Sequence, residues 1–138
     1  MERIVVDTNV LLVSISERSK LHWLFKGLLN QQFMLCVTKD ILSEYAEIIE
    51  QHMGHHVSES VMGVFDNLPN IVLITSYYKF QLLNDEDDNK FVDCAVAANA
   101  RFIVSHDKDF NKLRNIDFPK VLVIDTNQFK EILEEWSS

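Results

Sequence analysis

Turn-forming residues and cysteines are scarce in this chain of 138 residues, which has three glycines, two prolines and two cysteines. With no compositionally biased tract either, there is little room for a linker or a disordered tail. We therefore expect a single domain spanning residues 1–138, long enough to bury a sizeable core. Cys36 and Cys94 stand far apart in apolar surroundings, which favours two buried, reduced thiols.

Long apolar runs and an excess of basic residues are also missing. The chain has no run of 18 apolar residues, and it starts with a strand-like segment rather than a signal peptide, so we expect a cytoplasmic protein with no membrane partner. The net charge of −8 argues against nucleic-acid binding by surface cations and suits a basic partner. An acidic cluster filled by divalent cations can still act on phosphate, because the ions invert the local electrostatics.

Apolar periodicity predicts strands that alternate with helices. The expected strands are 4–6, 33–37, 71–74, 102–104 and 121–124. Helical spacing covers 11–18, 21–29, 41–49, 58–68, 91–98 and 129–136, and the segment 76–87 has no clear period. Such alternation is typical of a mainly parallel sheet covered on both faces, so the predicted fold class is α/β with three layers, α/β/α.

Polar residues stop the first predicted strand abruptly. The β-branched residues 4–6 are followed by Asp7, Thr8 and Asn9, after which apolar residues resume. Open α/β sheets bind their ligands at the carboxyl ends of the strands. Asp7 is therefore the first candidate for a functional residue.

Three further acids are predicted to lie near Asp7. Asp107 comes just after the strand 102–104, and Asp88 opens the next-to-last long helix on the same face as its buried stripe. Glu44 flanks the buried stripe of the helix 41–49. Carboxylates gathered at one sheet edge repel each other unless they are neutralised, and oxygen-only ligands favour Mg²⁺ or Mn²⁺. Such a site suits metal-assisted hydrolysis of a phosphodiester.

Four short motifs carry a family resemblance. They are Val6-Asp7-Thr8-Asn9-Val10-Leu11, Glu44 in a central helix, Asp85-x-Asp87-Asp88-Asn89-Lys90-Phe91, and Val104-Ser105-His106-Asp107-Lys108-Asp109-Phe110. In this order and spacing they resemble the PIN domain, most closely the prokaryotic (VapC-like) toxins of toxin–antitoxin pairs. The similarity extends over nearly the whole chain. Each motif alone is weak, and their order makes the combined signal specific.

The resemblance implies a metal-dependent ribonuclease on a five-stranded parallel sheet in the order 3-2-1-4-5. It also implies an RNA substrate, Mg²⁺ or Mn²⁺ as cofactor, an antitoxin protein as partner and a homodimer. Carried over onto this sequence, the acids are Asp7, Glu44, Asp88 and Asp107, with Asp93 as a further metal ligand and Thr8, Asn9 and Ser105 in support. Asp93 ranks lower, because the helical period places it about 140° from Asp88.

Simpler interpretations of the same residues stay open. Asp7 and Asp88 suit helix N-caps, Asp125-Thr126-Asn127 repeats the first motif at a helix start where capping explains it, and Asp85, Glu86 and Asp87 suit a solvated loop. His52, His55 and His56 suit a polar turn between helices better than a metal site. His106 suits substrate contact and an exposed loop equally. A modest basic rim near the site is open to Lys90, Lys108, Lys112 and Arg114.

Two other functions remain as alternatives. The first is an inactive PIN scaffold that only binds a protein partner, against which the presence of all four acids speaks. The second is a phospho-acceptor switch that uses Asp7, although the acid pair and later-strand lysine of that class are absent in the required order.

Overall fold

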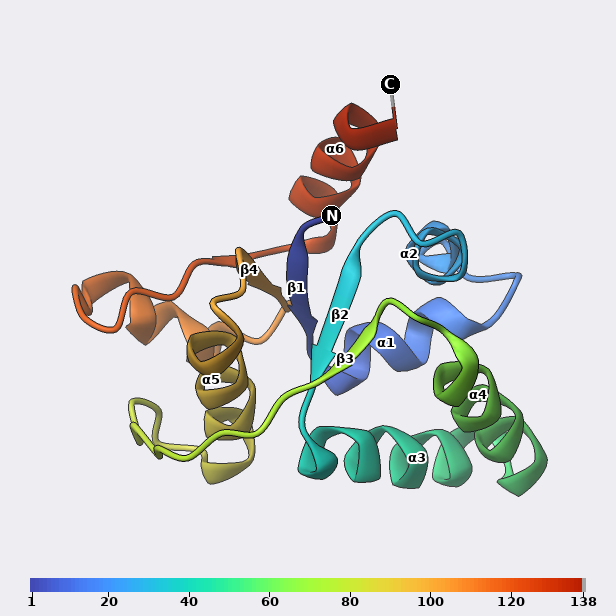
Figure 1. Ribbon diagram of the computed structural model, residues 1–138, viewed down its shortest axis with the longest axis horizontal. Helices are drawn as coiled ribbons and strands as arrows, with labels where there is room; N and C mark the ends of the chain where they lie inside the picture. The colour runs from blue at the N-terminus through green and yellow to red at the C-terminus, as the bar shows by residue number, and fades with distance from the viewer. Residues whose placement is uncertain (138) are drawn as a thin grey trace.

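The computed structural model describes residues 1–137 and contains one sheet of five parallel strands (Figure 1). The strand order is β3-β2-β1-β4-β5, which confirms the order that the family resemblance implies. Val6 of β1 pairs with Val104 of β4, so the polar residues that follow these two strands start side by side. The strand bounds are Arg3–Val6 (β1), Met34–Val37 (β2), Ile71–Leu73 (β3), Phe102–Val104 (β4) and Val123–Ile124 (β5).

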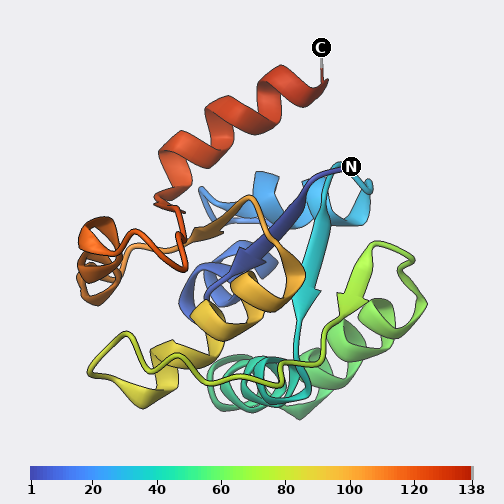
Figure 2. The same ribbon diagram turned by 60° about the vertical axis from the view of Figure 1, so that its left-hand side comes forward.

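Helices cover both faces of the sheet, which confirms the predicted α/β fold. Right-handed crossovers between neighbouring parallel strands place the connections from β1 to β3 on one face and the helix before β4 on the other. Figure 2 shows this helix, α5, in front of β1 with α1 behind. The bounds are Thr8–Ile15 (α1), His22–Leu29 (α2), Lys39–Met53 (α3), His55–Asn67 (α4), Glu86–Ala98 (α5), Lys108–Asn115 (the 3₁₀ helix η1) and Thr126–Ser137 (α6).

Several helices begin earlier than the apolar pattern predicts, because caps rather than apolar residues set their first turns. Asp7 Oδ1 accepts the Val10 N–H at 2.9 Å, so α1 begins at Thr8. Gly54, with a φ of 94°, ends α3 and lets α4 follow directly. At α5 the N-cap is Asp85 rather than Asp88, and Asp88 lies within the first helical turn. The last strand is also shorter than predicted and spans only two residues.

The central strands are buried on both faces. Ile4, Val5 and Val6 have no exposed surface, nor have Ile103 and Val104 beside them. This burial fixes the positions at which β1 and β4 end. Cys36 and Cys94 are buried free thiols, as predicted.

Within residues 1–137, none of the helices has the length and apolar character needed to cross a membrane.

Candidate active site

The carboxyl ends of β1 and β4 form the centre of the site. The Asp7 N–H donates to the Val104 carbonyl at 3.1 Å, and the Ser105 hydroxyl donates to Asp7 Oδ2. The Asp107 N–H in turn donates to Ser105 Oγ at 3.0 Å. Ser105 therefore joins two of the predicted acids across neighbouring strands, consistent with the supporting role expected for it.

Asp7 is the most buried carboxylate of this group, with 8% of its surface exposed. Burial raises its pKa, the hydrogen bonds from Ser105 and Val10 lower it, and the charge of Asp107 raises it. Asp7 also caps α1, and this role is compatible with metal binding by the same carboxylate. Its carboxylate is held in one orientation by donors on both oxygens.

Asp88 faces Asp107 from the first turn of α5. Burial, followed by the charges of Asp107 and Asp85, raises the pKa of Asp88 to about 7. Among the described side chains, Asp88 Oδ2 is one of two buried polar atoms that lack a hydrogen-bond partner. Such a carboxylate oxygen suits a divalent cation, because the cation would serve as its missing partner and would neutralise the neighbouring negative charges.

Two acids that sequence reasoning did not select extend this cluster. Asp85, Asp88 and Asp109 each place one oxygen within 4.8 Å of the others. Asp85 is exposed and lies just before α5, as expected for a solvated loop, and it also caps α5 and raises the pKa of Asp88. The spacing Asp85-x-x-Asp88 across a helix start, together with Asp107-x-Asp109, was the available signal. Asp87 between them is solvated as predicted, with 85% of its side chain exposed.

Glu44 is fixed by partners from two other helices. The Thr8 hydroxyl on α1 donates to Glu44 Oε2, and the Lys90 ammonium on α5 donates to Glu44 Oε1. Both Glu44 and Lys90 are largely buried, at 23% and 20% side-chain exposure. Thr8 was expected in support, whereas the pairing of Lys90 with Glu44 was not.

A pocket of about 310 Å³ opens beside Asp7 and Asp107. Asn9 and His106 line its polar side, while Val10, Val13 and Leu21 form its apolar wall. His106 Nε2 lies 2.8 Å from the Thr126 hydroxyl, so the loop that carries Asp107 is tied to the start of α6. Asp125 caps α6 by accepting the Gln128 N–H at 2.8 Å. The repeated Asp-Thr-Asn motif is therefore a helix cap, as predicted.

The comparisons with known proteins decide the family. The sequence profile of the PIN domain matches residues 3–109. The chain belongs to the PIN-domain family. No curated protein matches it.

Three solved structures share the fold of this PIN domain. VapBC2 from Rickettsia felis, bound to a DNA fragment from its promoter, has 15% identity and a TM-score of 0.63 over 89% of this chain and 98% of that chain. The Mycobacterium tuberculosis toxin VapC20, which cleaves the sarcin–ricin loop, has 12% identity and a TM-score of 0.57 over 78% and 92%. DNA-bound VapBC from Salmonella typhimurium has 14% identity and a TM-score of 0.58 over 91% and 99%.

Asp93 of this PIN domain is not among the three acids, Asp85, Asp88 and Asp109, whose oxygens gather within 4.8 Å. Its Oδ1 accepts the Phe80 N–H at 3.1 Å. Burial raises the pKa of Asp93, whereas this hydrogen bond and the charge of Lys79 lower it. The helical period had already placed Asp93 away from Asp88. The structure therefore connects Asp93 to the segment before α5, and its role as a metal ligand stays a prediction.

The remaining candidates are the histidines of the turn between α3 and α4 and the residues of the expected basic rim. His55 contacts Glu50 at 2.9 Å and Glu59 at 3.1 Å at the turn between α3 and α4, which agrees with a polar turn. Of the expected basic rim, Lys90 reaches inward to Glu44, and Lys112 donates to Asn84 Oδ1 at 3.0 Å. The rim is therefore partly used for contacts within the molecule.

Proposed function

We propose that this PIN domain is a metal-dependent endoribonuclease and the toxin of a toxin–antitoxin pair. Asp7, Asp88 and Asp107 would hold Mg²⁺ or Mn²⁺, Glu44 would complete the site, and Asp85 and Asp109 would add negative charge around it. The observation that carries the proposal is the buried, unpartnered Asp88 Oδ2 within a group of carboxylates at the sheet edge. Oxygen-only donors of this kind suit these two ions better than softer metals.

Each residue has a distinct part in this proposal. A bound divalent cation polarises the phosphate and lowers the pKa of water. Ser105 orients Asp7 and opposes the rise in its pKa that burial causes, because a hydroxyl that donates to a carboxylate favours its charged form. Thr8 and Lys90 hold the Glu44 carboxylate at the edge of the site. Asn9 lines the adjacent pocket, where its amide is available to a substrate group.

The test is cleavage of a structured RNA by the wild type and by Asp7→Asn, each with EDTA, Mg²⁺ or Mn²⁺. Asparagine keeps an oxygen to cap α1 but loses the charge, so the fold should be retained and cleavage lost. We expect metal-dependent cutting by the wild type and a reduction of at least about 100-fold in the variant, in the range found when a catalytic contact is removed. Circular dichroism of both proteins provides the control for folding.

Wild-type protein that neither cuts RNA nor binds Mn²⁺ in calorimetry would refute the nuclease. It would leave the protein-binding scaffold.

The proposed partner is an antitoxin protein that covers the acidic site. The structures from Rickettsia felis and Salmonella typhimurium are VapBC assemblies on DNA, which supports a partner of this class. A basic segment of that partner would complement the net charge of −8. Co-expression with the product of the adjoining gene should suppress RNA cleavage, and the mass of the purified complex would also test the expected homodimer.

A further inference from the structure

A groove runs along the start of α5, outside the acidic cluster. It consists of two hollows of about 270 and 710 Å³ that share Asp40, Lys79 and Lys90 as lining residues. Lys39 also lines the first hollow. Because Lys90 also contacts Glu44, the groove leads to the edge of the proposed active site. We call this feature the connector groove, after the segment 74–85 that borders it.

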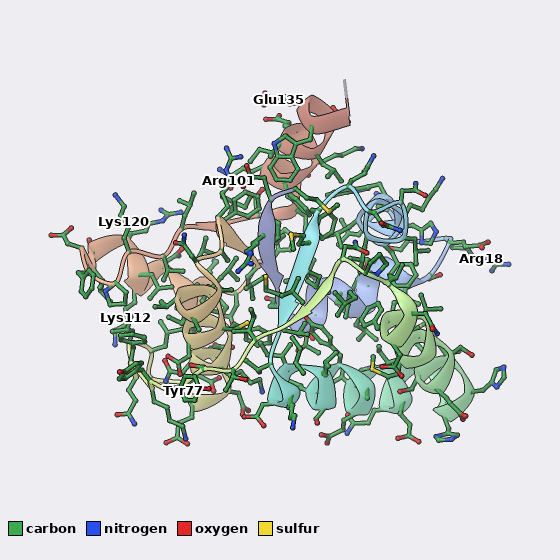
Figure 3. All side chains as sticks on the ribbon, viewed as in Figure 1. Arg18, Tyr77, Arg101, Lys112, Lys120 and Glu135 are labelled. Atoms are coloured by element: carbon green, nitrogen blue, oxygen red, sulfur yellow. The ribbon has the colours of Figure 1, made fainter. Side chains whose placement is uncertain are left out.

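Two tyrosines stand out from the same connector. Tyr77 and Tyr78 have 85% and 74% of their surface exposed, and they directly precede Lys79 of the groove. Figure 3 shows Tyr77 in the lower part of the molecule, far from Lys120 and Glu135. Exposed aromatic rings beside lysines are the elements with which proteins bind single-stranded nucleic acid, because rings stack on bases while cations contact phosphates.

The connector that carries these rings is fastened to α5 by two buried side chains. Asp93 accepts the Phe80 N–H at 3.1 Å. Asn89 accepts the Leu83 N–H at 2.9 Å and donates to the Leu83 carbonyl at 3.0 Å. Because the backbone is held at Phe80 and Leu83, just after the tyrosines, the entropic cost of ordering them on binding is lower.

We propose that the connector groove binds single-stranded RNA and leads it to the acidic cluster. Tyr77 and Tyr78 stack on bases, and Lys39 and Lys79 contact phosphates. The acids Asp40, Glu86 and Asp87 also line the groove, so stacking supplies more of the affinity than charge does. The inference rests on the proposed ribonuclease function and adds the surface that holds the RNA outside the acidic cluster.

Binding is measured by fluorescence anisotropy of a labelled oligouridine of roughly ten nucleotides. EDTA is present, so the RNA stays intact. The variant Tyr77→Ala/Tyr78→Ala should bind at least about tenfold more weakly, as expected for the loss of base stacking. Phe118→Ala/Lys120→Ala is the matched control, because Phe118 is 88% exposed in a different loop, and it should bind like the wild type. A duplex of the same length should bind more weakly than the single strand.

Lys79→Ala tests the phosphate contacts separately. Removing one phosphate contact to a single strand should reduce the slope of log affinity against log salt by about 0.7. An unchanged slope would exclude Lys79 from the RNA path.

The two proposals fail in different ways. If the wild type cuts RNA with Mn²⁺ while the tyrosine variant binds and cuts as the wild type does, the connector groove is refuted and the nuclease stands. If the tyrosine variant loses only the binding of a co-expressed protein partner, the surface binds protein and the inference is equally refuted. If the wild type binds the oligouridine through the tyrosines but cuts no RNA with any metal, the nuclease fails and the groove stands.

Discussion

At the scale of single residues, each acid takes its role from its immediate partners. Asp88 and Asp93 both lie on α5, five positions apart, and both are acids that the family resemblance selects. Asp88 has a buried oxygen without a partner, whereas Asp93 accepts a backbone N–H from the connector. The first environment fits a cation, and the second satisfies the carboxylate within the protein.

Asp93→Asn separates the two possible roles of this residue. The asparagine oxygen still accepts the Phe80 N–H, so we expect the Mn²⁺ affinity of Asp93→Asn to remain within about twofold of the wild type. Asp7→Asn should lower the Mn²⁺ affinity at least about tenfold, as expected for the loss of a ligand or of its orienting partner. Calorimetric titration with Mn²⁺ measures both. Asp93→Ala, which lacks the acceptor, should weaken oligouridine binding without changing Mn²⁺ affinity. Equal losses of Mn²⁺ affinity in Asp93→Asn and Asp7→Asn would make Asp93 a metal ligand.

At the scale of helices and strands, α6 is attached to the sheet by aromatic side chains. The ring of Phe129 lies 5.2 Å from Phe33 and 5.6 Å from Phe102 between centroids, with both pairs edge to face. Trp23 of α2 and Trp136 also pack against Phe129. Because Thr126 at the start of α6 contacts His106, this packing also supports the loop that carries Asp107.

Phe129→Ala should therefore reduce stability and disturb the site together. Phe129 is fully buried, so its loss should lower the free energy of unfolding by about 3–5 kcal/mol in urea denaturation. The exposed Phe118 provides the control, and Phe118→Ala should change this free energy by less than about 0.5 kcal/mol. A loss below about 1 kcal/mol at Phe129 would mean that α6 contributes little to the core.

The elements themselves were largely predictable, since each is encoded by local periodicity. Strands 4–6 and 102–104 follow from β-branched runs, and every long helix follows from its apolar stripe. Helix starts were less predictable, because Asp85 and Gly54 set them through single hydrogen bonds and dihedral angles. The pair of Lys90 with Glu44 spans 46 residues, and no local pattern encodes a contact of that kind.

At the scale of the whole molecule, the acids that gather at one sheet edge affect the stability of the fold. The protein carries a net charge of −8, and several of its acids meet at one sheet edge. For Asp88 the folded-state pKa of about 7 lies above the ordinary value of 3.8. The folded protein therefore holds a proton there that the unfolded chain has released, and this group opposes folding increasingly as the pH rises from about 4 to about 7.

Urea denaturation of the wild type and of Asp88→Asn in EDTA should show this effect. The stability of the wild type relative to the variant should fall as the pH rises between about 4 and 7, and level off above that range. With saturating Mn²⁺, the wild type should become more stable than Asp88→Asn above about pH 7, because the cation binds the ionised Asp88 of the folded state alone. A stability difference that is independent of pH and of Mn²⁺ would show that Asp88 is neither strained by its neighbours nor a ligand.

The hydrogen bond from Ser105 to Asp7 joins positions 98 residues apart. During synthesis, a ribosome that has released only the first hundred residues has produced Asp7, Glu44 and Asp88, but not β4, Ser105 or Asp107. The nascent chain therefore lacks β4, one of the two strands that pair with β1, and the acid that faces Asp88. A site built in this order becomes complete only after β4 and the residues that follow it have been made, so a product that stops before Ser105 would lack part of it.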